Sequence, residues 1–223
     1  MPKKTMCTPT VFTHDEALNI ISNMSMPYML MAQLMYGGGL RVSEVLRLRV
    51  KDINFAMGYI VIRDGKGFKD RTTLLPKSII PDFQEQVKIV ESLLKFDKAS
   101  GVGGVYMPHL LEKKYPSTGS SLGWQYLFPN PALSRVPRND IIRRHHIYSI
   151  TIQVHVKQAI KKSRIHKHAS CHTFRHSFAT HLLQAKYDLK QIQTLIGHSD
   201  IRTTEIYLHV LDELGEKVKS PID

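Results

Sequence analysis

A short β-hairpin signal constrains the fold of this chain, because the other periodic patterns in the sequence are helical. Tyr59–Arg63 is rich in β-branched and aromatic residues, and Arg71–Leu75 reads as the returning strand. Asp64-Gly65-Lys66-Gly67 lies between them and has the composition of a turn. We therefore expect a mainly helical α+β fold with a small antiparallel β-sheet, and with Lys66 at the tip of the hairpin.

Start and stop signals bound the helical segments. Thr13-His14-Asp15-Glu16 is a capping box, which predicts the start of a helix. Gly37-Gly38-Gly39 must end the apolar stretch over residues 28–36, because three glycines favour loop conformations. Ser43-Glu44 then opens a short helix. Further helices are expected from Pro81, over about 151–162, from 170, from the N-cap Asp188 to Gly197, and from about 199.

Residues 106–146 differ from the rest of the chain because they follow no clear period and contain five prolines. A long aperiodic stretch inside a domain is more often functional or mobile than structural filler. We therefore expect one domain over residues 1–223 that carries this stretch as an insertion.

The charge balance points to a polyanionic partner. The chain has 31 Lys and Arg against 19 Asp and Glu, a formal net charge of +12, and such a surface attracts phosphate backbones by releasing their counterions. A basic housekeeping protein is the plainer alternative. No apolar run reaches the ~18 to 20 residues of a membrane span, no secretory signal follows the basic N-terminus, and the two cysteines lie far apart. These features predict a soluble, cytoplasmic protein.

The segment over residues 170–183 places polar chemistry at the start of an amphipathic helix. Arg175 projects near the edge of the apolar stripe, and a partly buried guanidinium needs an anion. His172 lies one turn earlier, near the helix N-terminus, where a negative ligand is favoured. The pair suits a phosphate. The alternative is an arginine paired with a core carboxylate and a histidine that caps the helix.

A metal site is a weaker interpretation of the same histidines. His172 and His176 share a helix face beside Cys171, but Thr173 stands where a zinc protease needs its glutamate base. The sequence also lacks the close carboxylates that a two-metal nuclease requires. We therefore expect neither a metal nor another cofactor, and chemistry carried by side chains alone.

Five motifs, taken together, resemble a tyrosine recombinase of the phage integrase family. His172, Arg175, His198 and Tyr207 are separated by 3, 23 and 9 residues, as expected of that family. The motifs occur in the family's order and span about residues 11–211: Gly38-Gly39-Leu40-Arg41-Val42-Ser43-Glu44, Gly65-Lys66-Gly67-Phe68-Lys69-Asp70-Arg71, His172-Thr173-Phe174-Arg175-His176, Leu195-Ile196-Gly197-His198 and Thr203-Thr204-Glu205-Ile206-Tyr207. The resemblance implies the DNA breaking-rejoining enzyme fold.

The resemblance also implies a role for each catalytic position. Tyr207 would attack the scissile phosphodiester and form a 3′-phosphotyrosyl bond, which stores the bond energy for rejoining. Arg41 and Arg175 would bind the charged phosphoryl oxygens. Lys66 would protonate the leaving 5′-oxygen, and His172 would accept the proton of the tyrosine. His198 would donate a hydrogen bond to the phosphate, and Glu44 would orient Arg41 or His172.

Each of these positions also has a plainer interpretation. Arg41 and Glu44 match a surface pair spaced i, i+3, and Lys66 an ordinary turn residue. His198 is equally compatible with a helix C-terminus, and Tyr207 with the core. It is the joint order and spacing that favours the recombinase interpretation.

Within the family, residues 106–146 resemble the extra segment of integron integrases, which reads bases flipped out of a folded single strand. Trp124, the only tryptophan, would then provide a stacking surface for a base; its alternative is a core aromatic that anchors the insertion. The basic residues expected to contact DNA are Arg143, Arg144, Lys161 and Lys162.

The resemblance further implies DNA as the partner, with four protomers on two DNA sites and a monomer when free. The family's N-terminal clamp domain, of about a hundred residues, is not seen in this sequence, so we expect weak and salt-sensitive DNA binding. The alternatives are a non-catalytic DNA-binding remnant, a Xer-type or phage-type recombinase with another site, and a relaxing enzyme like the type IB topoisomerases.

Overall fold

The computed structural model describes residues 9–63, 70–102, 104–107, 109–115, 117–135 and 141–197. The side chains of His109 and Leu110 are outside this description. Lys66, His198 and Tyr207, together with the last helix expected from about residue 199, also lie outside the described residues.

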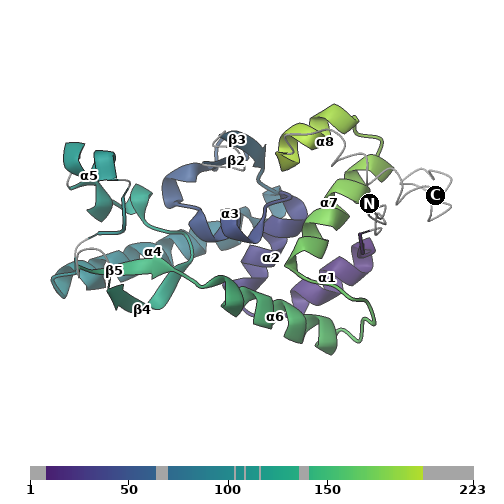
Figure 1. The fold of residues 1–223 in the computed structure, drawn as a ribbon, viewed down its shortest axis with the longest axis horizontal. Helices are drawn as coiled ribbons and strands as arrows, with labels where there is room; N and C mark the ends of the chain where they lie inside the picture. The colour runs from purple at the N-terminus through teal and green to yellow at the C-terminus, as the bar shows by residue number, and fades with distance from the viewer. Residues whose placement is uncertain are drawn as a thin grey trace, which may run out of the picture.

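Helices α1 (His14–Ser22), α2 (Tyr28–Gly37), α6 (Ser149–Lys162) and α7 (Cys171–Gln184) pack into the main helical layer (Figure 1). The capping box predicted at the start of α1 is present: Thr13 Oγ1 accepts from the Glu16 N–H at 3.1 Å, and a Glu16 carboxylate oxygen accepts from the Thr13 N–H at 2.8 Å. The core joins the N-terminal segment to α7, since the rings of Phe12 and Phe174 lie 5.3 Å apart and are both fully buried.

A three-stranded antiparallel sheet lies against this layer, in the order β1 (Ile53–Asn54), β2 (Tyr59–Ile62) and β3 (Arg71–Leu74). The hairpin predicted from the sequence is therefore confirmed up to its tip, and Ile62 pairs with Arg71 just below it. The short helices α3 (Val42–Arg47) and η1 (Val50–Asp52) connect α2 to this sheet, and η2 (Lys77–Ile79) follows it. The mainly helical α+β class is confirmed.

The insertion is more ordered than the sequence suggested. It contains α5 (His109–Lys114), η3 (Thr118–Ser120), η4 (Leu122–Trp124) and an antiparallel hairpin of β4 (Pro129–Arg135) and β5 (Ile142–His146). Together with the end of α4 (Ile80–Ala99) it forms the left part of Figure 1. The β4–β5 hairpin was not predicted, because two prolines interrupt β4 and charged residues occupy the buried positions of β5.

Helix α8 (Leu189–Ile196) closes the described chain as its sequence predicts. The Asp188 carboxylate accepts from the N–H groups of Lys190 and Gln191 at 2.8 and 3.1 Å. Gly197 ends the helix in the left-handed conformation with φ +64°, the usual role of glycine after a helix C-terminus.

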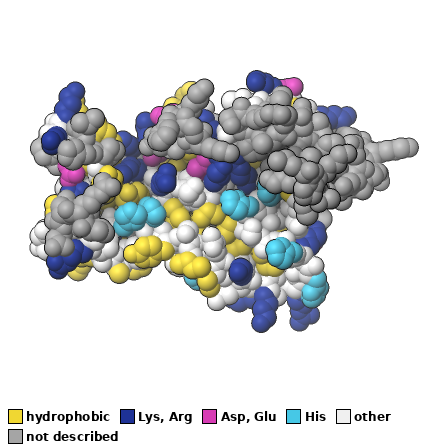
Figure 2. All heavy atoms as spheres, viewed as in Figure 1, with side chains coloured by type: hydrophobic (Ala, Val, Ile, Leu, Met, Phe, Trp, Pro, Cys, Tyr) yellow, Lys and Arg dark blue, Asp and Glu magenta, His cyan; other side chains and the backbone are white. Residues whose placement is uncertain are grey.

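Among the charged side chains on the face shown in Figure 2, dark blue Lys and Arg are more evident than magenta Asp and Glu, and cyan His side chains lie among them. Such a face suits a polyanionic ligand. None of the helices in the described ranges combines the length and the apolar character that crossing a bilayer requires.

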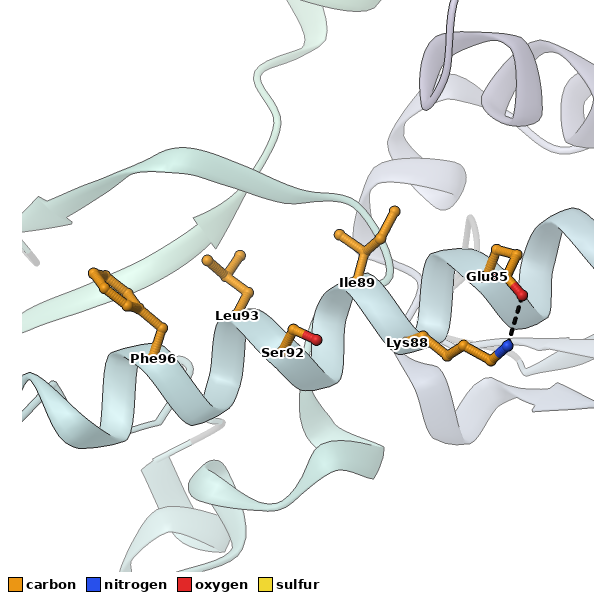
Figure 3. Close-up of a pocket in the computed structure, with 6 residues that line it drawn as sticks. All are labelled: Glu85, Lys88, Ile89, Ser92, Leu93 and Phe96. Carbon is orange, nitrogen blue, oxygen red and sulfur yellow. Dashed lines mark hydrogen bonds and ion pairs between the residues drawn. The ribbon is translucent and has the colours of Figure 1, made fainter.

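Helix α4 carries an exposed apolar stripe. Figure 3 shows Ile89, Leu93 and Phe96 on one side of the helix, and the side chains of Ile89 and Phe96 are 58% and 66% exposed. Lys88 donates to Glu85 at 2.6 Å beside them. Scattered exposed apolar residues are common on soluble surfaces.

Candidate active site

The loop after α2 positions Arg41 at the N-terminus of α3. Gly39 has φ +65°, and a Cβ at this position would lie 2.5 Å from a carbon of the Phe178 ring. Only glycine therefore satisfies both the backbone conformation and the close approach of α7. The chain then turns into α3 with Arg41 at the N-cap and Glu44 in the first turn.

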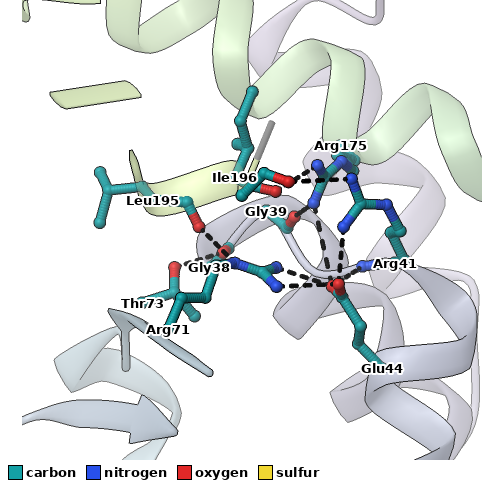
Figure 4. A network of polar contacts seen from close by, with 10 residues as sticks. Gly38, Gly39, Arg41, Glu44, Arg71, Thr73, Arg175, Leu195 and Ile196 are labelled. Atoms are coloured by element: carbon teal, nitrogen blue, oxygen red, sulfur yellow. Dashed lines mark hydrogen bonds and ion pairs between the residues drawn. The ribbon is translucent and has the colours of Figure 1, made fainter. Parts of the chain in front are cut away.

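Glu44 stands at the centre of a cluster of three arginines, which we call the arginine cluster: Arg41, Arg71 and Arg175 (Figure 4). Arg41 donates to Glu44 from its backbone N–H and from Nη1, both at 2.7 Å. Arg71 donates Nη1 to Oε1 at 2.9 Å and Nη2 to Oε2 at 2.8 Å. Arg175 Nη1 lies 3.9 Å from Oε2. Four hydrogen bonds thus occupy the acceptor sites of one carboxylate.

The same three arginines also cap the C-terminal end of α8. Arg71 Nε donates to the carbonyl oxygen of Leu195 at 3.0 Å, Arg175 Nη2 to that of Ile196, and Arg41 Nη2 to that of Gly197 at 3.4 Å. These carbonyls have no partner within the helix and lie at the negative end of its dipole. The cluster therefore fixes the backbone immediately before His198.

Arg175 is the most deeply placed member of the cluster. Its side chain is 5% exposed, against 20% for Arg41. Nη1 donates to the carbonyl oxygen of Gly39 at 2.5 Å, which ties α7 to the loop that positions Arg41. Arg41 and Arg175 thus both reach the Glu44 carboxylate, from segments far apart in the sequence.

The charge of the cluster is unbalanced in favour of an anion. Burial raises the pKa of Glu44, but the hydrogen bonds and charge of Arg71, with those of Arg41, lower it to about 2. Glu44 is therefore ionised at neutral pH and supplies one negative charge to three guanidinium groups. Planar guanidinium groups bind phosphate oxygens bidentately, so the remaining positive charge favours a phosphodiester.

His172 lies beside this cluster at the start of α7, exposed, in the wall of a cavity that Arg41 also lines. His176, one turn later, is half-buried, and burial with the nearby charges of His172 and Arg175 lowers its pKa to about 4. His181 contributes to packing, since its Nδ1 lies 2.9 Å from the hydroxyl of Tyr36. Of the histidines in α7, His172 is the one placed to act on a ligand at the cluster.

Of the residues predicted to form the catalytic site, the structure brings together Arg41, Glu44, His172 and Arg175. Lys66, His198 and Tyr207 are outside the described residues. Described residues near Lys66 and His198 in the sequence lie at the cluster: Arg71 comes five residues after Lys66, and Gly197 directly precedes His198. Arg71 itself was quoted within a motif, but no role was assigned to it; the sequence signal was an arginine at the foot of the hairpin that is predicted to carry a catalytic lysine.

Arg143 and Arg144, which the sequence predicts to contact DNA, are placed in buried ion pairs. Arg144 is buried and donates Nε and Nη2 to the two carboxylate oxygens of Asp97, each at 2.6 Å. Arg143 is buried as well, with an ion pair to Glu112 and a hydrogen bond to the Val105 carbonyl at 3.1 Å. The pairing of β5 turns these side chains toward carboxylates of α4 and α5, so they hold the insertion in place.

Trp124 has features of both roles considered for it, a stacking surface for a base and a core aromatic that anchors the insertion. Its side chain is half-buried, and Lys51 Nζ lies 2.9 Å from the ring centroid, so a cation already stacks on one face. Burial lowers the pKa of Lys51 to about 8. The Trp124 carbonyl accepts from Arg49 Nη1 at 2.6 Å, which anchors η4 to the segment after α3.

Lys161 and Lys162 are exposed in the last turn of α6. Within the described part of the chain neither forms an ion pair, so both are available to a polyanion.

Comparisons with known proteins agree with this geometry. The model of the phage integrase family matches residues 10–213. An integrase/recombinase from Escherichia coli is 45% identical over 222 residues, which cover 100% of this chain and 66% of that protein. A tyrosine recombinase XerD from Listeria innocua is 33% identical over 94% of this chain and 61% of its own length. The chain thus spans about two thirds of the length of these relatives.

Solved structures show the same fold. The crystal structure of XerA recombinase superposes with a TM-score of 0.64 at 23% identity, over 93% of this chain and 64% of that one. XerH bound to a palindromic difH substrate in a post-cleavage complex gives a TM-score of 0.60 at 24% identity, over 94% of this chain and 53% of that one.

Proposed function

The chain belongs to the phage integrase family, and we propose that it cleaves and rejoins DNA strands at specific sites through a transient bond between Tyr207 and a 3′-phosphate. The observation that carries this proposal is the arginine cluster. Three guanidinium groups from separate segments meet at one carboxylate, and they donate to the carbonyls that lead into His198.

The reaction balances without an external energy source. The Tyr207 oxygen attacks the phosphorus as His172 accepts its proton, and the bond to the 5′-oxygen breaks as Lys66 protonates that oxygen. The liberated 5′-hydroxyl of a second strand reverses these steps and releases the tyrosine. Arg41 and Arg175 stabilise the negative charge that develops on the phosphoryl oxygens, with His198 as a further donor.

Glu44 keeps Arg41 in position during this chemistry. It fixes the Arg41 backbone and side chain at once, and Arg71 fixes Glu44 from the opposite side. A catalytic guanidinium that is held before the substrate arrives costs less free energy to organise in the transition state.

For the substrate, we propose folded single-strand sites of the integron cassette type. Support comes from the ordered insertion, which places Trp124 against Lys51 of η1, in the segment that follows α3. An aromatic ring with an adjacent cation can stack on an unpaired base. The alternative is a Xer-type duplex site, which the similarity to XerD favours. In either case four protomers would assemble on two sites.

The test is a nicked suicide substrate that traps the covalent protein–DNA complex. We expect a covalent band with the folded single-strand site that disappears in Tyr207→Phe. A band only with a duplex site would support the Xer-type alternative. DNA binding without any band, also after fusion to the N-terminal clamp domain of a relative, would leave a non-catalytic DNA-binding protein.

A further inference from the structure

A cavity of about 430 Å³ opens beside the arginine cluster, and the proposed reaction leaves most of its wall unused. Three segments meet there: α3, the junction of β5 with α6, and the first turn of α7. The residues that matter here are Arg41, Arg47, His146, Ser149, Gln153 and His172.

The wall of this cavity is suited to an anion. The described residues that line it include two arginines and no carboxylate. Arg47 is exposed, and within the described ranges it forms no ion pair. Ser149 and Gln153 are spaced i, i+4 on α6, so both face the same side of that helix. Guanidinium, hydroxyl and amide groups are all hydrogen-bond donors.

His146 adds a neutral polar group to this wall. Its Nδ1 lies 2.8 Å from the carbonyl oxygen of Ile147, which can only accept, so this nitrogen carries the proton. Burial lowers the pKa of His146. The fixed positive charge of the cavity therefore comes from the arginines.

The position of the cavity indicates which anion it receives. Arg41 and His172 line it and are also the residues proposed to act on the scissile phosphate. Successive nucleotides of one strand rise by only about 3.4 Å along the helix axis. A strand that places its scissile phosphate on Arg41 and Arg175 therefore brings a neighbouring phosphate to this cavity.

We propose that Arg47, together with Ser149 and Gln153, binds the backbone phosphate next to the scissile one. This inference rests on the proposed function, because it takes the scissile phosphate to lie at the arginine cluster. Contacts to phosphates fix the register of a protein on its DNA. Arg47 is thus a positioning residue that aligns the strand before the tyrosine attacks.

The test combines a protein variant with a chemical change in the DNA. A methylphosphonate removes the charge of one chosen phosphate, and binding is measured by fluorescence anisotropy for the wild type and for Arg47→Ala. We expect about a tenfold loss of affinity from either change alone, in the range of a charge-assisted hydrogen bond. The methylphosphonate at the neighbouring position adds no further loss in Arg47→Ala.

Two controls make the result specific. Lys98→Ala removes an exposed cation in the last turn of α4, at the far end of the molecule, and should keep the full response to the methylphosphonate. Arg47→Ala should make the negative slope of log affinity against log salt shallower by about 0.7 to 0.9, because one phosphate contact is lost. Arg47→Lys should restore the slope of the wild type.

The outcome separates this inference from the proposed function. If the methylphosphonate at every position weakens the wild type and Arg47→Ala equally, the cavity does not bind a phosphate and the inference is wrong. If the binding experiment gives the expected coupling but no covalent complex with Tyr207 forms, the phosphate contact stands and the proposed cleavage fails. If the covalent complex forms but the coupling is absent, the proposed cleavage stands and the phosphate contact of Arg47 fails.

Discussion

Arg71 holds both carboxylate oxygens of Glu44, at 2.9 and 2.8 Å, and thereby connects the foot of the β2–β3 hairpin to the residue that positions Arg41. Lys66, the proposed proton donor, lies in the sequence between β2 and β3. A buried ion pair therefore links the strand that follows Lys66 to Arg41, the guanidinium proposed to bind the phosphate.

We expect Glu44→Gln to lower the free energy of unfolding by about 3 to 5 kcal/mol, because it leaves buried guanidinium groups without their anion. Urea denaturation followed by circular dichroism measures this. Glu85→Gln is the matched control, since it removes a carboxylate from an exposed pair with Lys88 and should change stability by less than about 1 kcal/mol. Equal effects of the two substitutions would contradict the central role of Glu44.

Glu44 also predicts a loss of stability in acid. Its folded pKa of about 2 lies below the ordinary value of 4.5, so the unfolded chain takes up the proton first as the pH falls. The contribution of Glu44 is therefore fully present above pH 4.5 and is lost as the pH falls from 4.5 through about 2. Unfolding free energies measured across this range should fall less steeply in Glu44→Gln than in the wild type.

His176 should cause a separate loss of stability, at higher pH than the loss caused by Glu44. Its folded pKa of about 4 is below the ordinary 6.5, so the neutral form is favoured in the folded state. This contribution is present above pH 6.5 and is lost as the pH falls from 6.5 toward 4. NMR titration of the imidazole protons measures the pKa directly; an ordinary value would contradict the buried placement of this ring.

Arg175→Lys and Arg41→Lys should differ in their effect on stability. Both replace a guanidinium at the proposed phosphate site, so each should slow formation of the covalent complex by about 10²- to 10³-fold. Arg175 alone is nearly fully buried and bonded to Gly39 and Ile196, so only Arg175→Lys should also lower the denaturation midpoint markedly. Single-turnover cleavage and urea denaturation separate the two effects.

The insertion should depend on the pair formed by Arg144 and Asp97. Asp97→Asn leaves a buried guanidinium without its carboxylate, which should cost about 3 to 5 kcal/mol. The double variant Asp97→Leu with Arg144→Met should be less destabilised than this single change. Hydrogen exchange of the β4–β5 amides locates the effect, and protection that is unchanged in Asp97→Asn would show that the pair does not hold the hairpin.

Local signals in the sequence were sufficient for much of the fold. Caps such as Thr13 and Asp188, the glycine at 197 and the β-rich residues on each side of the hairpin act through neighbours in the chain, so their pattern is visible in a sequence. The order and spacing of the family's motifs likewise grouped Arg41, Glu44, His172 and Arg175 as residues of one predicted site.

Tertiary pairing was not visible in the same way. Arg143 and Arg144 read as exposed basic residues, yet carboxylates on α4 and α5 bury them. Arg71 gave no sign of its partner, because Glu44 lies 27 residues away in the sequence. For Arg71, Arg143 and Arg144, the partner that makes the residue structural is therefore one that the local sequence does not reveal.

The capping of α8 by three arginines has a consequence for a nascent chain. These guanidinium groups come from three separate segments and are oriented by carbonyls that are synthesised after all of them. Until α8 docks, the three arginines lack those acceptors. We therefore expect the arginine cluster to become organised only after the segment that ends at Gly197 has been synthesised.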